Sequence, residues 1–347
     1  MPIADLRSGI EAFNNLKVSR RELSGALASE IDNVNRPIGN RQSPIGNLVE
    51  CVPNFSEGRN RETIARLGEA IARVETACVL DTHIDPDHNR SVITFVAHPH
   101  HIVVAALNAV SLAAELIDMR QHTGVHPRLG ATDVLPFVPV AGVTLDECAA
   151  LAHSAGERIA RELSIPVFYY ERAALRPERI NLEDVRRGAF ELLREQIAVE
   201  PSRAPDVGPL QVHETAGAIA VGARPFLIAF NINLQTNDVA VARQIAQAIR
   251  ARQGGLPFVK ALGFELKTRG LVQVSMNLVN YEVTGMEQAY EAVRKETEKR
   301  RIEIASTEIV GLVPEKALNV GAEYFSKLER FERDKVLENR ILKLCVG

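Results

Sequence analysis

The sequence predicts an α+β protein made of two similar units, each with the element order β-α-β-β-α-β. Two observations lead to this prediction. From residue 47 onward, short apolar segments rich in β-branched residues alternate with longer segments whose apolar residues recur at helical spacing. The order of these segments in residues 47–224 then recurs in residues 225–330. We therefore expect two ferredoxin-like subdomains with mixed sheets, helices on one face of each sheet, and a ligand groove between them.

The elements of the first unit follow from local patterns. Residues 47–52 form a short apolar strand, and Asn60 begins a helix because its side chain can accept hydrogen bonds from the first turn. The later strands are expected at residues 78–81, 91–96, 134–140 and 166–170. The helices are expected at residues 61–74, 100–119 and 145–163.

The second unit follows from the same kinds of pattern. A hairpin turn is expected at Thr268-Arg269-Gly270, where glycine supplies a left-handed position. Its first strand resembles that of the first unit because both carry asparagines near their ends: Asn54 in one, Asn231 and Asn233 in the other. Strands are expected at residues 226–232, 258–266, 271–278 and 303–311, and helices at residues 239–252 and 286–299.

Both ends of the chain differ from this regular pattern. Residues 33–46 are rich in Asn, Pro and Gly, a composition typical of linkers. We therefore treat residues 1–46 as an N-terminal extension outside the catalytic core, and residues 331–347 as a C-terminal tail.

Charge and composition exclude several classes of partner. Lys and Arg number 41 against 44 Asp and Glu, a formal net charge of −3, so no global basic field attracts nucleic acid or an anionic membrane. The N-terminus lacks the basic start and apolar core of a secretory signal, and residues 101–116 look too short and too polar to span a bilayer. We therefore expect a cytoplasmic protein that holds any anionic substrate with a few local arginines.

Four cysteines occur far apart in the sequence, with no C-x-x-C pair, at Cys51, Cys78, Cys148 and Cys345. Each lies among apolar neighbours. This pattern favours reduced, buried thiols.

Several familiar catalytic motifs are absent from the sequence. It contains no G-x-x-x-x-G-K-[ST] phosphate loop, no G-x-G-x-x-G after a strand and no G-x-S-x-G elbow. Nucleotide binding and serine hydrolysis therefore have little support.

A first polar loop, residues 81–90, joins two expected strands. It holds three carboxylates and two imidazoles within ten residues: Asp81, His83, Asp85, Asp87 and His88. Imidazole and carboxylate are good ligands for zinc, iron or manganese. A metal-dependent hydrolase of C–N bonds, using His83, Asp85 and His88, is therefore one alternative. Substrate binding and purely structural turns are the others.

A second polar loop, residues 120–133, contains His126. Pro127 favours an extended backbone at His126, and Gly124 and Gly130 allow tight turns around it. An imidazole titrates near neutrality and can move protons at physiological pH. Arg128 lies two residues further and can hold an anion on the same side. These residues alone leave open whether His126 is catalytic or structural.

The motifs around these loops resemble glutamate formimidoyltransferase, the formiminotransferase part of the bifunctional formiminotransferase-cyclodeaminase. The resemblance runs in order from about residue 47 to residue 325. It rests on residues 48–58 (LVECVPNFSEG), 116–119 (LIDM), 124–133 (GVHPRLGATD), 226–234 (FLIAFNINL), 273–278 (QVSMNL) and 310–314 (VGLVP).

The resemblance implies transfer of the formimino group from N-formimino-L-glutamate to N5 of tetrahydrofolate, late in histidine degradation. It also implies a folate groove between two subdomains and a homodimer, with no metal. The cyclodeaminase region has no counterpart here, so we expect a monofunctional transferase. The family's catalytic histidine maps onto His126. Its folate-contacting stretch maps onto Gly208, Pro209, Leu210, Gln211, Val212, His213, Glu214, Thr215, Ala216 and Gly217.

The remaining site residues are assigned by chemistry. His126 acts as general acid/base, and Asp81 or Asp85 orients it or contacts the charged formimino group. Arg90 and Arg128 are candidates for substrate carboxylates, because guanidinium groups pair with them in a bidentate manner. The asparagines predicted to contact substrate are Asn54, Asn89, Asn231 and Asn233.

One position departs from the family. The mammalian bifunctional enzyme has an aspartate where this chain has His83, although Asn89 and Arg90 match. The catalytic contribution of the first polar loop therefore stays open. So does the donor, since formylglutamate or a 5-formylfolate differs from formiminoglutamate by one O in place of one NH. A folate-binding protein without catalysis is a further alternative.

Overall fold

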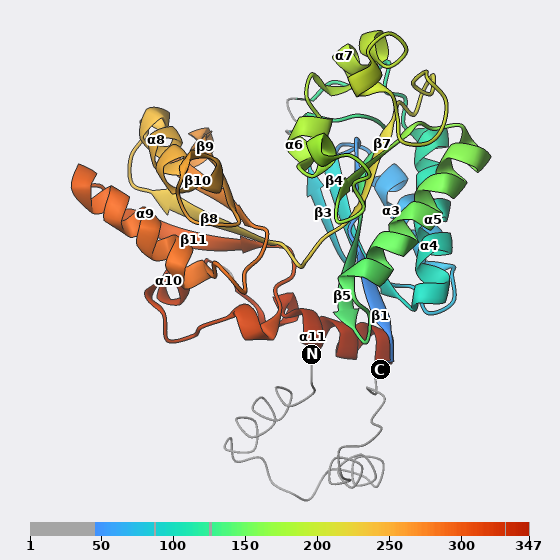
Figure 1. Cartoon of the computed structure of the whole chain (residues 1–347). Helices are drawn as coiled ribbons and strands as arrows, with labels where there is room; N and C mark the ends of the chain where they lie inside the picture. Colours follow the sequence, from blue (N-terminus) through green and yellow to red (C-terminus); the bar gives the residue numbers. More distant parts are fainter. Residues whose placement is uncertain (1–45, 87, 125–126, 330, 347) are drawn as a thin grey trace, which may run out of the picture.

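The computed structural model describes residues 46–86, 88–124, 127–329 and 331–346 (Figure 1). Two units, each with one sheet, lie side by side, and a C-terminal arm connects them. The chain is therefore an α+β protein, as predicted. The predictions for His126 and for the extension up to residue 45 lie outside the described residues.

The first unit contains a mixed seven-stranded sheet. Strand β4 pairs with β1, β2 and β3, while β5 pairs with β1, β2 and β7. Only the β5–β7 and β6–β7 pairs are parallel. The strands are β1 (Leu48–Cys51), β2 (Asn54–Phe55), β3 (Cys78–Asp85), β4 (Arg90–Ala97), β5 (Thr132–Ala141), β6 (Val167–Glu171) and β7 (Ile219–Ala223).

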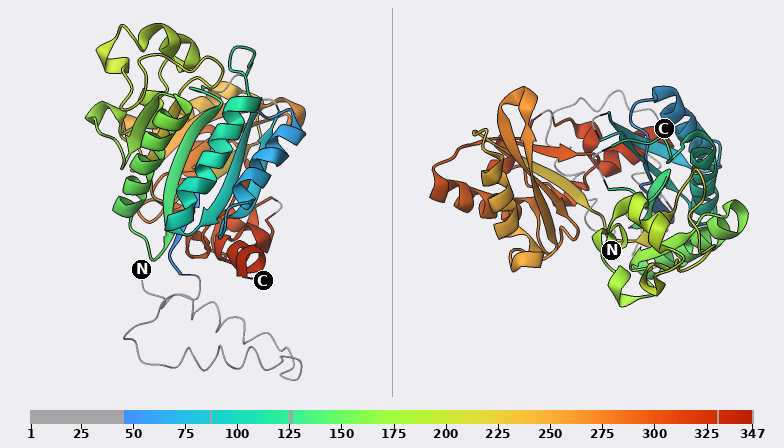
Figure 2. Two further views of the ribbon diagram at one scale, coloured as in Figure 1. Left: turned by 90° about the vertical axis from the view of Figure 1, so that its right-hand side faces the viewer. Right: turned by 90° about the horizontal axis from the view of Figure 1, so that it is seen from above.

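Three helices cover one face of this sheet: α3 (Arg61–Ala72), α4 (Pro99–Leu116) and α5 (Leu145–Leu163) (Figure 2). The Asn60 side chain accepts hydrogen bonds from the backbone of Glu62 and Thr63, which confirms the predicted helix start. Two short helices, α6 (Leu182–Val185) and α7 (Ala189–Gln196), follow β6.

Helix α4 is long and apolar enough to cross a membrane, contrary to the expectation from residues 101–116. The helix spans 18 residues, Pro99–Leu116, and is therefore two residues longer than the stretch 101–116. It packs between α3 and α5, and Ile102, Ala106 and Val110 are buried in the core beneath it. This packing is that of a core helix.

The second unit has the predicted element order, with strand order β11-β8-β10-β9. All of its pairings are antiparallel, so the prediction of a mixed sheet is wrong for this unit. Gly270, at φ +63°, ends the turn between β9 and β10 and confirms the predicted hairpin. The elements are β8 (Ile228–Leu234), α8 (Val239–Ile249), β9 (Val259–Leu266), β10 (Leu271–Leu278), α9 (Met286–Arg300), β11 (Ile304–Val310) and α10 (Glu323–Ser326).

Helices α3, α4 and α5 of the first unit and α8 and α9 of the second lie on the outer sides, and the uncovered faces of the two sheets turn toward each other (Figure 1). Glu183 of α6 contacts the second unit through Lys260 and Arg252, at 3.9 Å and 3.8 Å. Each unit has its own core between sheet and helices.

The C-terminal arm, residues 331–346, connects the second unit to the first. It contains α11 (Leu337–Ile341), whose Leu337 and Ile341 pack with Leu48, Leu80 and Val96 on the uncovered face of the first sheet. Nε of Arg340 also donates a hydrogen bond to the carbonyl oxygen of Leu80, at 2.7 Å. The end of the chain is thus part of the first unit's packing.

Cys78 at the start of β3 and Cys345 in the C-terminal arm form a disulfide, with their Cα atoms 6.0 Å apart. The prediction of four reduced thiols is therefore wrong for this pair. A separation of 267 residues hid the contact, because only the folded arm brings Cys345 to β3. Cys51 and Cys148 are free and buried, and burial raises the pKa of Cys148 to about 12.

Candidate functional site

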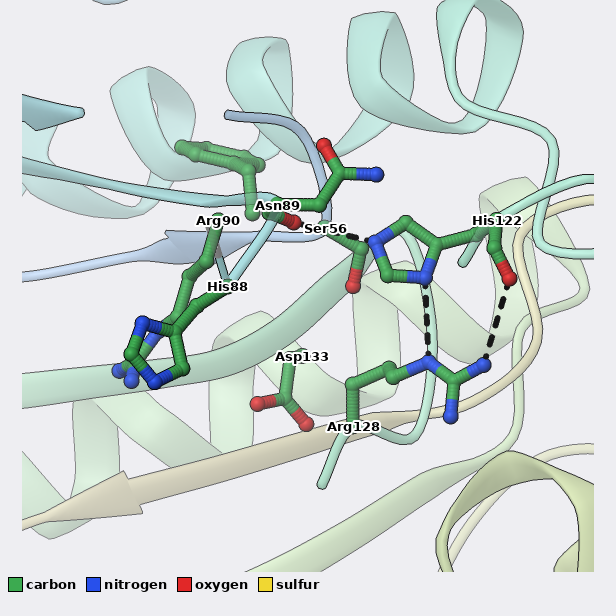
Figure 3. A pocket seen from close by; sticks show the side chains of 8 residues that line it. Ser56, His88, Asn89, Arg90, His122, Arg128 and Asp133 are labelled. Carbon is green, nitrogen blue, oxygen red and sulfur yellow. Dashed lines mark hydrogen bonds between the residues drawn. The ribbon is translucent and has the colours of Figure 1, made fainter. Parts of the chain in front are cut away.

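A pocket opens in the first unit where the end of β2 meets the starts of β4 and β5 (Figure 3). The space between its walls that is empty of protein atoms, including the part open to solvent, is about 200 Å³. Most of the side chains around it come from three segments, 55–58, 85–90 and 121–128. The lining residues are Phe55, Ser56, His88, Asn89, Arg90, His122, Arg128 and Asp133.

Two glycines allow the three segments to approach closely. A Cβ atom on Gly58 would lie 2.2 Å from the carbonyl oxygen of Asp85, and one on Gly124 would lie 2.5 Å from that of His88. Such distances are far below van der Waals contact. Any side chain at either position would push the backbones around the pocket apart.

Asn89 joins the three segments with its side chain. Its Oδ1 accepts a hydrogen bond from the backbone N–H of Gly58 at 3.0 Å, and its Nδ2 donates to the carbonyl oxygen of Thr123 at 3.1 Å. Its backbone has φ of +50°, a left-handed conformation that asparagine tolerates better than most residues. Asn89 was predicted to contact substrate, and the structure shows it holding the walls of the pocket together.

Arg90 lies on the floor of the pocket and donates a hydrogen bond to Oδ1 of Asn54. Asn54 in turn donates to the carbonyl oxygen of Val52 at 2.8 Å. Burial and the nearby charge of Arg186 together lower the pKa of Arg90 to about 10, and the charge of Asp133 opposes this shift. Arg90 therefore remains a cation at neutral pH. The two predicted site residues Asn54 and Arg90 lie together.

Asp133 and Arg186 form an ion pair beside Arg90 that the sequence predictions did not include. Asp133 also accepts a hydrogen bond from the backbone N–H of Leu129 at 2.9 Å. This contact fixes the segment that follows residues 125–126. The G-A-T-D end of the motif at 124–133 was the available signal for Asp133, whereas Arg186 lies in a segment without a recognised pattern.

Arg128 and His122 form the opposite wall (Figure 3). Nε of Arg128 donates to Nδ1 of His122 at 3.2 Å, so Nδ1 is the acceptor and the ring proton lies on Nε2. Nε2 then donates to the carbonyl oxygen of Asn89 at 3.0 Å. Burial lowers the pKa of His122, the bond to Asn89 opposes this shift, and the charge of Arg128 lowers it further. His122 is therefore neutral at physiological pH.

The guanidinium group of Arg128 also pairs with the carboxylate of Glu191 in α7, at 2.7 Å and 3.0 Å. Arg128 is mostly buried, while Glu191 is largely exposed. A substrate carboxylate of similar geometry can therefore compete with Glu191 for this group. Arg90 and Arg128 both line this pocket, on two sides of it.

Strand β3 continues to Asp85, so the prediction of a loop is wrong for residues 83–85. The segment that was predicted as the first polar loop contributes a close pair, Asp85 and His88. Nδ1 of His88 lies 2.6 Å from Oδ2 of Asp85, and the backbone N–H of His88 donates to Oδ1 at 3.0 Å. Partial burial raises the pKa of Asp85, but the hydrogen bonds from His88 outweigh this effect and hold it below its usual value. Asp85 is thus a carboxylate at neutral pH.

Asp81 and His83 lie further along β3, away from the pocket lining. The pairing of β3 with β4 places Asp81 opposite Thr94, His83 opposite Val92 and Asp85 opposite Arg90. These three β3 side chains therefore share the uncovered face of the sheet. Within the described ranges, no group of three His, Cys, Asp or Glu side chains is placed to hold a metal ion.

Two sequence signatures match the chain. The N-terminal subdomain of the formiminotransferase domain matches residues 48–224, and the formiminotransferase domain matches residues 229–347. The chain belongs to the formiminotransferase family. The resemblance found in the sequence motifs is thereby confirmed.

Curated relatives of this formiminotransferase are similar over most of the chain. Glutamate formimidoyltransferase of Thermoplasma acidophilum is 49% identical over 85% of this chain and 98% of its own length. The enzyme of the same name from Streptococcus pyogenes is 45% identical over 85% of this chain and 99% of its own length. Formimidoyltransferase-cyclodeaminase of Rattus norvegicus is 42% identical over 85% of this chain and 56% of its own length.

The stretch of this formiminotransferase that was predicted to contact folate, Gly208–Gly217, lies beside the segment that carries His126. The backbone N–H of Met119 donates to the carbonyl oxygen of Thr215, and that of Ala131 to Ala216, both at 2.8 Å. A Cβ atom on Gly130 would lie 2.2 Å from the same Ala216 oxygen. The stretch predicted to contact folate thus packs, backbone to backbone, against residues at the two ends of the second polar loop.

The predicted substrate contacts Asn231 and Asn233 of the formiminotransferase lie elsewhere, on β8 of the second unit. Both are on the uncovered face of the second sheet. Asn231 donates to Glu308 at 3.3 Å, and Asn233 donates to Ser306 at 3.0 Å. The structure therefore separates the predicted asparagines into two groups, one in each unit.

Proposed function

We propose that this protein transfers the formimino group from N-formimino-L-glutamate to N5 of tetrahydrofolate. The observation that carries the proposal is the match of both units to the formiminotransferase family, together with relatives that are 45–49% identical over nearly their whole length. Tetrahydrofolate is then a co-substrate that leaves the enzyme changed, as 5-formiminotetrahydrofolate, with L-glutamate as the second product.

The reaction forms one bond and breaks one. N5 attacks the formimino carbon, and the resulting tetrahedral intermediate loses the bond between that carbon and the glutamate nitrogen. N5 must give up its proton, and the departing nitrogen must receive one. A single imidazole can perform both transfers, and we assign this role to His126. The described ends of its loop support the assignment because both lie at the pocket: Gly124 packs against the carbonyl oxygen of His88, and Arg128 lines the pocket.

The pocket around Arg90 and Arg128 supports an anionic donor. Two cations on opposite sides suit the carboxylates of formiminoglutamate, since guanidinium groups bind carboxylates in a bidentate manner. Asp85 is the carboxylate closest to this pocket among the predicted catalytic aspartates, and it is already paired with His88. It is placed to contact a cationic formimino group. Asp81, four residues earlier on β3, has less support.

An incubation with alternative donors tests the proposal. The purified protein is mixed with tetrahydrofolate and either N-formiminoglutamate or N-formylglutamate, and the folate absorbance is followed. We expect turnover with formiminoglutamate. Turnover with formylglutamate but not with formiminoglutamate would show that formylglutamate is the donor. If neither donor is turned over although the protein binds folate, a non-catalytic folate-binding protein is favoured. The same reaction is repeated after metal ions have been removed with a chelator, and loss of activity would favour the alternative of a metal-dependent hydrolase.

We also infer a ferredoxin-like organisation of both units. In the second unit the strand order β11-β8-β10-β9 is fourth, first, third, second in chain order, which supports this inference. A cytoplasmic homodimer is a proposal that rests on the resemblance, and light scattering of the purified protein tests its oligomeric part.

A further inference from the structure

The C-terminal arm is attached to both units of the protein (Figure 1). Its first half is held on the second unit by backbone hydrogen bonds. The N–H of Val313, which follows β11, donates to the carbonyl oxygen of Lys335, and the N–H of Leu337 donates to that of Val313, both at 2.9 Å. The backbone N–H of Glu315 also donates to Oε2 of Glu338 at 2.9 Å. This half of the arm is therefore a continuation of the second unit.

The second half of the arm is fastened to the first unit by side chains. Leu337 and Ile341 pack on the apolar surface of the first sheet, and Nε of Arg340 donates to the carbonyl oxygen of Leu80 at 2.7 Å. Helix α11, which carries these arm residues, has five residues, and helices this short are not stable by themselves. The docking of this half on the first unit therefore depends strongly on the disulfide at its end.

The disulfide lies at the surface of the protein. Cys345 is exposed and Cys78 is half-buried. Two neighbours of Cys345 in the arm, Leu342 and Leu344, are 46% and 44% exposed. Exposed disulfides are reduced more readily than buried structural ones, and in reducing compartments such bonds are mostly transient and serve redox sensing. The sulfur atom of Cys345 is thus accessible to thiol reductants.

Strand β3 connects the disulfide to the pocket of the first unit. Cys78 is its first residue, and Asp85, which pairs with the pocket residue His88, is its last. The pairing of β3 with β4 shifts at Leu80, a bulge that places both Leu80 and Asp81 on the uncovered face. Leu80 packs under the arm, and Asp81 begins the row of polar side chains that leads to Asp85. The arm therefore holds the strand whose other end reaches the pocket.

We propose that the Cys78–Cys345 disulfide is a reversible redox switch that fastens the second unit to the first. When the disulfide is closed, the arm holds the end of β11 and the start of β3 at the same time. When it is open, the second half of the arm leaves β3. The short connection between β7 and β8, residues 224–227, is then the remaining covalent link between the two units.

The switch opens by thiol–disulfide exchange with two thiols of a reductant. The first reductant thiolate attacks the exposed sulfur of Cys345, and Cys78 leaves as a thiolate that takes up a proton. The second reductant thiolate attacks the reductant sulfur of this mixed disulfide, and Cys345 leaves and takes up a proton as well. Two electrons thereby reduce the protein disulfide to two thiols, and the two reductant thiols are oxidised to one disulfide.

Hydrogen exchange of the full-length protein tests the switch, before and after incubation with millimolar glutathione. Alkylation and mass spectrometry count the remaining disulfide. We expect glutathione to reduce it and to accelerate exchange in residues 331–346 by roughly tenfold or more, because local opening is no longer restrained. Cys345→Ser should exchange like the reduced wild type with or without glutathione. Leu344→Ser, the matched control, changes an exposed neighbour, keeps both cysteines and should respond like the wild type. The reduced wild type needs no substitution, so the test stands even if Cys345→Ser does not fold.

Steady-state kinetics measure the effect of the switch on the pocket, and this part rests on the proposed function. We expect reduction to lower kcat/KM for formimino transfer roughly tenfold in the wild type, because β3 is held less firmly, and to leave it unchanged in Cys345→Ser. A disulfide that resists glutathione, or an arm that exchanges equally fast in both forms, would overturn the switch. Faster exchange with unchanged kcat/KM would overturn its link to the pocket. If no form of the protein transfers a formimino group, the proposed function fails, and the exchange experiment still decides on the switch.

Discussion

At the scale of single residues, His122 shows how a side chain without a recognised role can organise a site. It accepts from Arg128 and donates to Asn89, so it needs the neutral form of its ring. The sequence predictions concerned His126, four residues further along the chain. His126 was chosen because the proline that follows it favours an extended backbone. The role of His122 instead depends on Arg128 and Asn89, which lie near it only in the folded protein.

Replacing His122 by Gln should alter the pH dependence of stability. The pKa of His122 is lower in the folded than in the unfolded protein. Its stabilising contribution is thus complete above the unfolded pKa of about 6.5 and is lost as pH falls through the folded pKa. Gln can keep a donor and an acceptor without titrating. Urea unfolding at pH 7.5 and 5.5 should show a smaller loss of unfolding free energy in the variant. Equal losses would contradict the assigned neutral state.

Replacing His126 by Ala should lower kcat by roughly 10²–10⁴-fold, the range for a positioned acid/base. Folate binding should be largely retained, because the predicted folate stretch Gly208–Gly217 is held by its own backbone contacts. Single-turnover kinetics and folate titration measure the two quantities. Near-normal turnover in this variant would rule out the general acid/base role.

At the scale of elements, the pocket depends on glycines that let loops touch. Gly124→Ala should disrupt the contact with the carbonyl oxygen of His88 and lower kcat/KM by about tenfold or more, because a displacement of 1 Å at a site is costly. Gly68→Ala in α3 is the matched control, since no atom lies within 4 Å of its new Cβ. It should keep full activity and raise the unfolding free energy by about 0.5–1 kcal/mol.

The sequence predicted most of the long elements and missed the short ones. The four strands of the second unit were predicted because their side chains alternate or form β-branched runs between clear turns. Strand β2 has only two residues and follows Pro53, and β7 is a run of small residues, Ile219–Ala223, that pairs between β5 and β6. Neither has a pattern of its own, because tertiary pairing makes them strands.

The candidate site divides in the same way. Asn54, Asn89, Arg90 and Arg128 were found because they lie in recognisable motifs, and the structure brings all four to one place. The partner groups His122, Asp133, Arg186 and Glu191 were not assigned. Their importance comes from contacts between segments up to 63 residues apart, which a single sequence does not reveal.

At the scale of the whole molecule, the C-terminal arm contributes to the unfolding free energy through its disulfide with the first unit. The Cys78–Cys345 disulfide closes almost the entire described chain into one loop. Cys345→Ser should lower the unfolding free energy by about 2–5 kcal/mol, because a long closed loop restricts the unfolded state. Denaturant unfolding with and without a reducing agent measures the effect. Reduction should destabilise the wild type and leave the variant unchanged, and equal responses would contradict a disulfide in the native protein.

The arm also has a consequence for how the protein is made. Leu48, Leu80 and Val96 are synthesised early, yet their apolar partners Leu337 and Ile341 follow only after the whole second unit. The apolar surface formed by Leu48, Leu80 and Val96 therefore stays exposed while the whole second unit is synthesised. A chain truncated before Leu337 would keep that apolar surface exposed permanently. Chaperones and proteases that recognise exposed apolar surface would then bind the first unit of such a truncated chain.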